Sequence, residues 1–145
     1  MGLFDSINIS ASALTAEKTR IDIINKNMAN ANTTRTSAGT PYRRQMVVFE
    51  ENKDKFSNHL EKYAKKFNGK GVKISEIVQD QTEFKRIYEP GHPDANENGY
   101  VFLPNVEMVK EMVDMIDAQR AYEANITAMN GTKSMMMKAL EIGRR

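Results

Sequence analysis

The sequence predicts an α+β protein in which a long helix at each end of the chain flanks a small β-rich middle. Near the start, apolar residues recur every seven positions, at Ile7, Leu14, Ile21 and Met28, with Leu3 and Ile24 between them. Near the end, steps of three and four residues connect Met112, Met115, Gln119, Tyr122, Ile126, Met129, Lys133, Met136 and Leu140. This spacing is typical of coiled coils, so we expect the two helices to form a coiled-coil layer.

The first helix is predicted over residues 3–28, which contain neither glycine nor proline. It ends in an asparagine-rich segment, residues 27–34. Asparagine tolerates the left-handed backbone conformation that ends helices, and its side chain bonds nearby backbone groups.

The middle of the chain contains short segments rich in β-branched and aromatic residues, which favour strands. We predict strands over 43–50, 71–79, 84–88 and 99–103, with a turn at 90–93. A polar, lysine-rich stretch at 51–70 separates the first two strands, and its helical spacing of apolar residues is compatible with a short exposed helix. The predicted organisation is therefore a discontinuous helical domain, residues 1–34 and 105–145, around a β-rich domain, residues 35–104, with an insert at 51–70.

The second helix is predicted from Asn105, a candidate N-cap, to about Ile142. Such a helix is roughly 57 Å long at 1.5 Å per residue. A middle of about sixty residues buries too little surface to cover both helices along their length. Part of each apolar stripe must therefore pack on the other helix or on another chain.

Composition excludes several classes of function. The chain has no cysteine, which excludes disulfides, thiolate catalysis and cysteine-ligated zinc. A net charge of +2 gives no support for nucleic-acid binding, and no apolar run is long enough to span a membrane. The first residues lack the basic and apolar regions of a cleaved secretory signal. We find no catalytic motif, so we expect no enzymatic activity, no cofactor, no small-molecule substrate and no metal.

One loop leaves an alternative function open. Residues Asp94–Gly99 reproduce the first six positions of an EF-hand calcium loop, and a calcium-responsive binding module is the alternative from a different class. However, the twelfth position is Asn105 in place of glutamate, and Pro90 and Pro93 block the entering helix. A coiled-coil adaptor inside the cell is a third interpretation.

Several motifs resemble those of the flagellar axial protein family, and most closely the proximal rod subunits. The motifs shared by rod and hook proteins are Ile9-Ser10-Ala11-Ser12-Ala13-Leu14, the segment from Asn27 to Thr34, and the segment from Ala118 to Asn125. The rod-specific motifs are Pro41-Tyr42-Arg43-Arg44, Gly71-Val72-Lys73, the segment from Pro90 to Asn96, Gly99-Tyr100-Val101 and Pro104-Asn105-Val106. The resemblance covers residues 1–50 and 71–145, and residues 51–70 match nothing in the family.

The resemblance implies a structural subunit of the bacterial flagellar basal body. Such proteins leave the cell through the flagellar type III export apparatus without a cleaved signal. In the periplasm they polymerise with other rod proteins and with copies of themselves into a tubular drive shaft, which transmits torque and encloses the export channel, without membrane insertion. By the same resemblance, the turn after the first helix would be fixed by Asn27, Asn30, Asn32, Thr33 and Thr34, and the second helix would be held by Arg120, Tyr122 and Asn125. The candidate interface also includes the stripe residues Ile7, Leu14, Ile21, Met28, Met115, Ile126, Met129, Met136 and Leu140.

Overall fold

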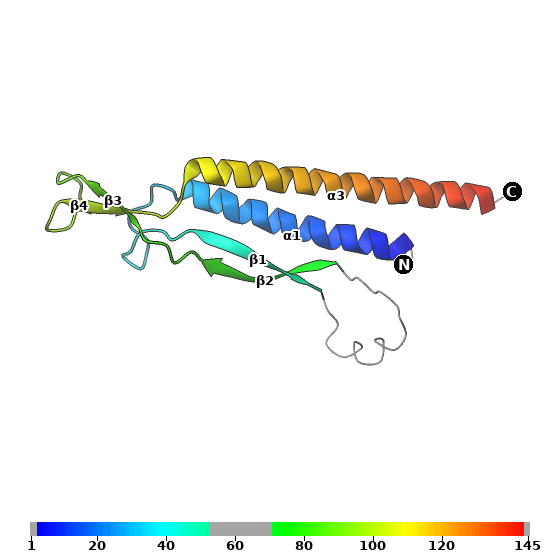
Figure 1. The fold of residues 1–145 in the computed structure, drawn as a ribbon, viewed down its shortest axis with the longest axis horizontal. Helices are drawn as coiled ribbons and strands as arrows, with labels where there is room; N and C mark the ends of the chain where they lie inside the picture. The colour runs from blue at the N-terminus through cyan, green and yellow to red at the C-terminus, as the bar shows by residue number, and fades with distance from the viewer. Residues whose placement is uncertain (1–2, 53–70, 144–145) are drawn as a thin grey trace, which may run out of the picture.

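The computed structural model describes residues 3–52 and 71–143, and it shows an elongated molecule with two long helices side by side (Figure 1). In chain order the elements are α1 (Leu3–Ala29), β1 (Gln45–Glu51), β2 (Val72–Gln79), β3 (Lys85–Tyr88), β4 (Tyr100–Leu103) and α3 (Met108–Gly143). The predicted α+β class is confirmed, and so are the predicted helices and strands, whose ends shift by a few residues. The possible helix within 51–70 falls almost entirely outside the described residues.

The two helices run antiparallel. Near one end of the pair the hydroxyl oxygens of Ser6 and Thr132 lie 3.4 Å apart, and near the other end Asn27 donates a hydrogen bond to Glu111. This register leaves the last turns of α3 beyond the start of α1, where they project as a free helical end (Figure 1). In the described part of the chain, neither helix has the length and hydropathy to cross a lipid bilayer.

The seam between the helices differs from the predicted stripe. On α3 the buried residues are Glu111, Ala118 and Thr132, whereas the predicted positions Met112, Gln119 and Lys133 are exposed. The observed seam follows the same alternation of three and four residues and continues through the half-buried Met115, Tyr122, Asn125, Met129 and Met136. The predicted period is therefore observed, and the seam coincides with the predicted stripe at Met115, Tyr122, Met129 and Met136 and passes one residue earlier at Glu111, Ala118 and Thr132.

Small and polar side chains explain the phase of this seam. The distance between packed helices depends on the side chains at their contact, and small residues permit a close approach. Ala118 is 0% exposed in α3, and Ser10 is buried in α1. A larger apolar residue, Ile24 of α1, is buried as well, whereas others, such as Val113 and Ile116 of α3, are exposed to solvent.

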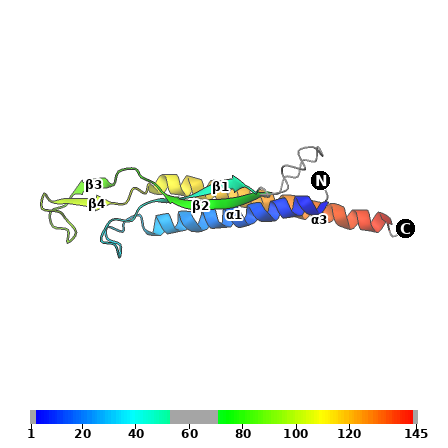
Figure 2. The ribbon, with the colours of Figure 1, turned by 90° about the horizontal axis from the view of Figure 1, so that it is seen from below.

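Strands β1 and β2 form an antiparallel hairpin that packs along α1 (Figure 2). The register runs from Gln45 opposite Gln79 to Glu51 opposite Val72, with a bulge between Val48 and Phe49. The backbone N–H of Val72 donates to the Ser12 hydroxyl over 3.1 Å, which attaches the start of β2 to α1.

Strands β3 and β4 form a second antiparallel hairpin at the far end of the molecule (Figure 1). Its register runs from Lys85 opposite Leu103 to Tyr88 opposite Tyr100, and the rings of this last pair meet edge to face, with centroids 5.3 Å apart. Val101 points to the buried side of this hairpin and is 3% exposed.

Gly131 gives a first testable prediction. It lies inside α3, and a Cβ atom there would have no neighbour within 4 Å. Glycine costs about 1 kcal/mol relative to alanine in a helix interior because the unfolded chain loses more conformational freedom. Gly131→Ala should therefore raise the free energy of unfolding by about 0.5–1 kcal/mol in urea denaturation. No change, or a loss of stability, would show that α3 requires glycine at this point.

Candidate assembly interface

A buried polar cluster joins both helices to the start of β1. Arg44, just before β1, donates from Nε to Glu111 Oε1 over 2.6 Å, and the Glu111 side chain is 0% exposed. The other oxygen, Oε2, accepts a hydrogen bond from Asn27 Nδ2 over 3.0 Å. The side-chain oxygen of Asn27, Oδ1, in turn accepts hydrogen bonds from the Tyr42 hydroxyl at 2.9 Å and from the Gln45 backbone N–H at 3.0 Å. Each of the four buried side chains, Asn27, Tyr42, Arg44 and Glu111, thus bonds a partner from a different segment of the chain.

Arg44 also reaches two further carboxylates. Its guanidinium lies 3.2 Å from Asp114 Oδ2 and 3.8 Å from Asp80 Oδ2. The backbone N–H of Thr82 donates to Asp80, and with the charge of Arg44 it holds the pKa of Asp80 below its usual value. Burial of a charged group is costly unless the group is paired and hydrogen-bonded, and this arrangement satisfies that condition for Arg44 and Glu111.

Asn105 does not cap the second helix as predicted. Helix α3 begins three residues later, at Met108, and the Asn105 side chain instead connects two loops. Its Oδ1 accepts from the Arg44 backbone N–H at 2.8 Å, and its Nδ2 donates to the Asp80 carbonyl and the Thr82 hydroxyl, at 3.0 and 2.8 Å. The hydrogen bonds that Asn105 makes with these two loops therefore take the place of the helix cap that its local sequence position predicts.

The buried hydroxyl of Tyr42 gives a pH-dependent prediction. Burial, followed by the negative charge of Glu111, raises the pKa of Tyr42 above its ordinary value of 10.0. A raised pKa means that the folded state favours the neutral phenol, so this stabilisation is complete below pH 10 and is lost as the pH rises above it. We expect Tyr42→Phe to lose about 0.5–1.5 kcal/mol at pH 7 through the missing hydrogen bond. Its stability should then fall less steeply than that of the unmodified chain above pH 10, and parallel urea denaturation curves would contradict this.

The asparagine-rich turn after α1 is closed by backbone hydrogen bonds and by its own side chains. Asn30 Nδ2 donates to the Lys26 carbonyl at 2.9 Å, and Asn30 Oδ1 accepts from the Thr33 hydroxyl at 3.2 Å. Thr34 instead donates to Asp94 Oδ2 at 2.8 Å, whereas the side chain of Asn32 is exposed. The structure thus places three of the predicted turn residues in hydrogen bonds and assigns Asn27 to the buried cluster.

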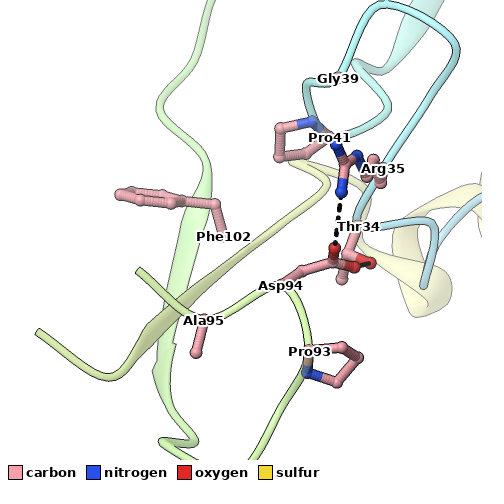
Figure 3. A pocket seen from close by; sticks show the side chains of 8 residues that line it. All are labelled: Thr34, Arg35, Gly39, Pro41, Pro93, Asp94, Ala95 and Phe102. Atoms are coloured by element: carbon pink, nitrogen blue, oxygen red, sulfur yellow. Dashed lines mark hydrogen bonds and ion pairs between the residues drawn. The ribbon is translucent and has the colours of Figure 1, made fainter. Parts of the chain in front are cut away.

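In the loop that resembles a calcium site, the side-chain oxygens of Asp94 and Asn96 accept hydrogen bonds from, or pair with, groups of the protein itself. Asp94 accepts from Thr34 and lies 3.8 Å from the Arg35 guanidinium, at one wall of a cavity of about 310 Å³ that Phe102 also lines (Figure 3). Asn96 Oδ1 accepts from two backbone N–H groups of the same loop. Among the described residues, no three acidic or histidine side chains are placed to hold a metal ion. The side-chain oxygens of Asp94 and Asn96 are already bonded to protein donors, and this geometry does not favour the calcium alternative.

Comparison with known proteins identifies the family. The sequence model of the family "Flagellar basal body rod FlgEFG protein C-terminal" matches residues 97–142. The flagellar basal-body rod protein FlgC of Bacillus subtilis (strain 168) is 48% identical, over 99% of this chain and 100% of its own length. FlgC of Borreliella burgdorferi is 46% identical over 98% of each chain, and FlgC of Salmonella typhimurium (strain LT2) is 39% identical over 99% and 100%. The chain belongs to the FlgC family of flagellar basal-body rod proteins. It is a structural subunit of the basal-body rod.

In a rod subunit, the outer surfaces of the helix pair are the candidate contacts with other subunits. The predicted stripe residues of α1, namely Ile7, Leu14, Ile21 and Met28, are all half-buried, so each keeps part of its surface open to solvent. On α3, Met115, Tyr122, Asn125, Ile126, Met129 and Met136 are half-buried, whereas Arg120 and Leu140 are exposed. The Asn125 amide donates to the Ala121 carbonyl within its own helix. Their role in contacts between subunits stays a prediction.

Sequence reasoning missed the roles of Arg44, Tyr42 and Glu111. Arg44 and Tyr42 belong to the Pro41–Arg44 motif that carried the resemblance to rod proteins, and this motif was the available signal. Glu111 gave none, because an acidic residue in the first turn of a helix is expected to be exposed, where it stabilises the helix dipole. Only the approach of three distant segments buries it.

Proposed function

We propose that this FlgC-family chain polymerises with other rod proteins and with copies of itself into the proximal part of a tubular drive shaft that transmits torque and encloses the export channel. In this proposal, residues 1–34 and 105–145 form the assembly domain, and residues 35–104 lie outside it. The role is structural, and no catalytic step is assigned to it.

One observation about the helix pair supports the proposal. The buried residues of α3 in one subunit are Glu111, Ala118 and Thr132, whereas large apolar side chains of this helix, such as Val109, Val113 and Leu140, remain exposed. Exposed apolar surface of this kind marks a site of protein–protein contact. Contacts that do not close into a ring generate a helical assembly, which is the form that a shaft requires.

The proposal also includes a route and a location. The chain passes through the flagellar type III export apparatus without a cleaved signal and assembles in the periplasm. The similarity to rod proteins supports this route. The exposed apolar side chains of α3 support it too, because a subunit that carries them must not assemble before it reaches the periplasm.

Deletion of the gene in its source organism tests the proposed function. We expect non-motile cells whose basal bodies, imaged by electron microscopy, end before a rod is formed, and we expect the intact gene to restore both rods and swimming. Mass spectrometry of purified basal bodies should find the chain with an unprocessed N-terminal region. Complete rods and normal swimming in the deletion strain would contradict the proposal.

A further inference from the structure

Strands β3 and β4 and the loop between them form a unit, residues 85–103, which we call the tip. It extends beyond the end of the helix pair (Figures 1 and 2). No Cα atom of β3 or β4 lies within 8 Å of a Cα atom in any other described helix or strand. Val101, at 3% exposed, is the one buried side chain of these two strands. A two-stranded hairpin that buries so little surface is positioned by its connections to the rest of the chain.

The loop of the tip is braced from within. Asn96 Oδ1 accepts hydrogen bonds from the backbone N–H groups of Asn98 and Tyr100, at 3.0 and 2.9 Å. The backbone N–H of Asp94 donates to His92 Nδ1 at 3.1 Å. These bonds hold the loop to the hairpin, so a rotation of the tip displaces Asp94 with it.

The base of the tip is fixed to the rest of the molecule. Pro104 follows β4 directly and is fully buried, and the next residue, Asn105, donates to the Asp80 carbonyl. At the start of β3, Lys85 Nζ donates to the Val106 carbonyl at 3.3 Å. Rotation of the tip is therefore confined to the short two-stranded ribbon beyond these residues.

Beyond this base, the tip is bonded to the segment that follows α1 through a single residue, Asp94. Among the described residues, Asp94 Oδ2 accepts from the Thr34 hydroxyl at 2.8 Å, and Oδ1 lies 3.8 Å from the Arg35 guanidinium. We call these two interactions the latch. The Arg35 side chain is 72% exposed, so the ion pair contributes little. One hydrogen bond to a partly exposed carboxylate shifts an equilibrium between two positions by roughly tenfold.

A cavity of about 310 Å³ separates the tip from the segment that the latch attaches it to (Figure 3). Gly39 and Pro41 line it on one side, and Pro93, Ala95 and Phe102 of the tip line it on the other. Close packing is what holds two surfaces rigidly against each other. Across this cavity the two sides are not packed, so the latch alone sets the distance between them.

We infer that the tip is a jointed unit, with a latched position, which the structure shows, and released positions reached by rotation about its base. Asp94 is the positioning residue, because it carries both interactions of the latch. Release breaks the bond to Thr34 and leaves the tip and the helix pair intact. The joint allows one chain to present the exposed rings of Tyr88 and Tyr100 at more than one angle to its helices. It is a property of the free chain and does not depend on the proposed function.

Distances between paired spin labels test the joint. Because the chain has no cysteine, label pairs can be introduced at the exposed Asp22 of α1 and Glu97 of the tip, and at Asp22 and Glu123 of α3 as a reference. Double electron–electron resonance on the full chain gives the distance distribution of each pair. Asp94→Ala and Thr34→Val remove the latch from its two sides. We expect each variant to raise the ratio of released to latched positions in the 22–97 distribution about tenfold and to leave the 22–123 distribution unchanged.

Thr36→Val is the matched control. The Thr36 hydroxyl donates to the Thr40 carbonyl within the same segment as the latch, so its loss should leave both distributions unchanged. Hydrogen exchange of the Tyr100 amide, which is bonded inside the tip, should stay as slow in the latch variants as in the unmodified chain. The inference is overturned if neither latch variant changes the 22–97 distribution, or if Thr36→Val changes it equally. Faster exchange at Tyr100 would also overturn it, because the tip would then unfold instead of rotating.

Discussion

Replacing Arg44 by methionine is expected to lower the free energy of unfolding by about 3–5 kcal/mol. The substitution keeps much of the apolar stem but removes the guanidinium that pairs with the fully buried Glu111. A buried carboxylate that has lost its partner charge is among the most destabilising changes known, because its desolvation is no longer offset. Urea denaturation of the purified chain measures the loss directly.

Two further variants separate this effect from a general loss of packing. Arg44→Met combined with Glu111→Leu removes both charges, and we expect it to recover at least half of the lost stability, since a well-packed apolar pair often replaces a buried ion pair without cost. Lys138→Ala breaks an ion pair with Glu141 that is largely exposed on both sides, and it should cost less than about 0.5 kcal/mol. A loss for Arg44→Met as small as that for Lys138→Ala would contradict the assigned role of the buried cluster.

Gly71→Ala is expected to cost about 2–5 kcal/mol. Gly71 has a φ of +86°, which is strained for a residue with a side chain, and this strain costs roughly 1–2 kcal/mol. An added Cβ would also collide with the Ser12 hydroxyl and approach within 3.3 Å of the Ile9 Cα. Overpacking of this kind adds about 1–3 kcal/mol. Because this contact attaches the β1–β2 hairpin to α1, the hairpin should separate locally from the helix.

Two other glycines provide matched controls. Gly39 has a φ of +76° but no neighbour within 4 Å of an added Cβ, so Gly39→Ala should cost only the backbone strain. Gly91 has neither constraint, and Gly91→Ala should change stability by less than about 0.5 kcal/mol. The predicted order of stability loss is therefore Gly71, then Gly39, then Gly91. A different order in urea denaturation would show that the close approach to Ser12 does not position the hairpin.

The elements of this fold could be predicted because each carries a local signal. Heptad spacing located both helices, and alternation with β-branched residues located the strands. Periodicity did not fix the phase of the seam in α3, because this helix has apolar residues on more than one face. Met112 is the more apolar candidate for the seam, yet the structure buries its neighbour Glu111, which bonds Asn27 of α1 and Arg44.

The buried cluster could not be predicted for a related reason. Asn27, Arg44 and Glu111 lie far apart in the sequence, and each alone is typical of an exposed polar position. Their contact depends on the antiparallel register of the helices and on the path of the loop before β1. Asn27 was expected to act within its own turn, yet it connects α1 to β1 and α3 instead.

The absence of cysteine from this chain permits the most direct test of the central claim, that the outer faces of the helix pair are the surfaces that rod assembly buries. Single cysteines are introduced at Met112 on α3 and, as a control, at Glu76 on the exposed side of β2, both of which are exposed in the single subunit. Maleimide labelling is then compared between the free chain and purified basal bodies. The account predicts that assembly blocks labelling at position 112 and leaves position 76 reactive. Labelling at 112 that persists in the assembled rod would contradict it.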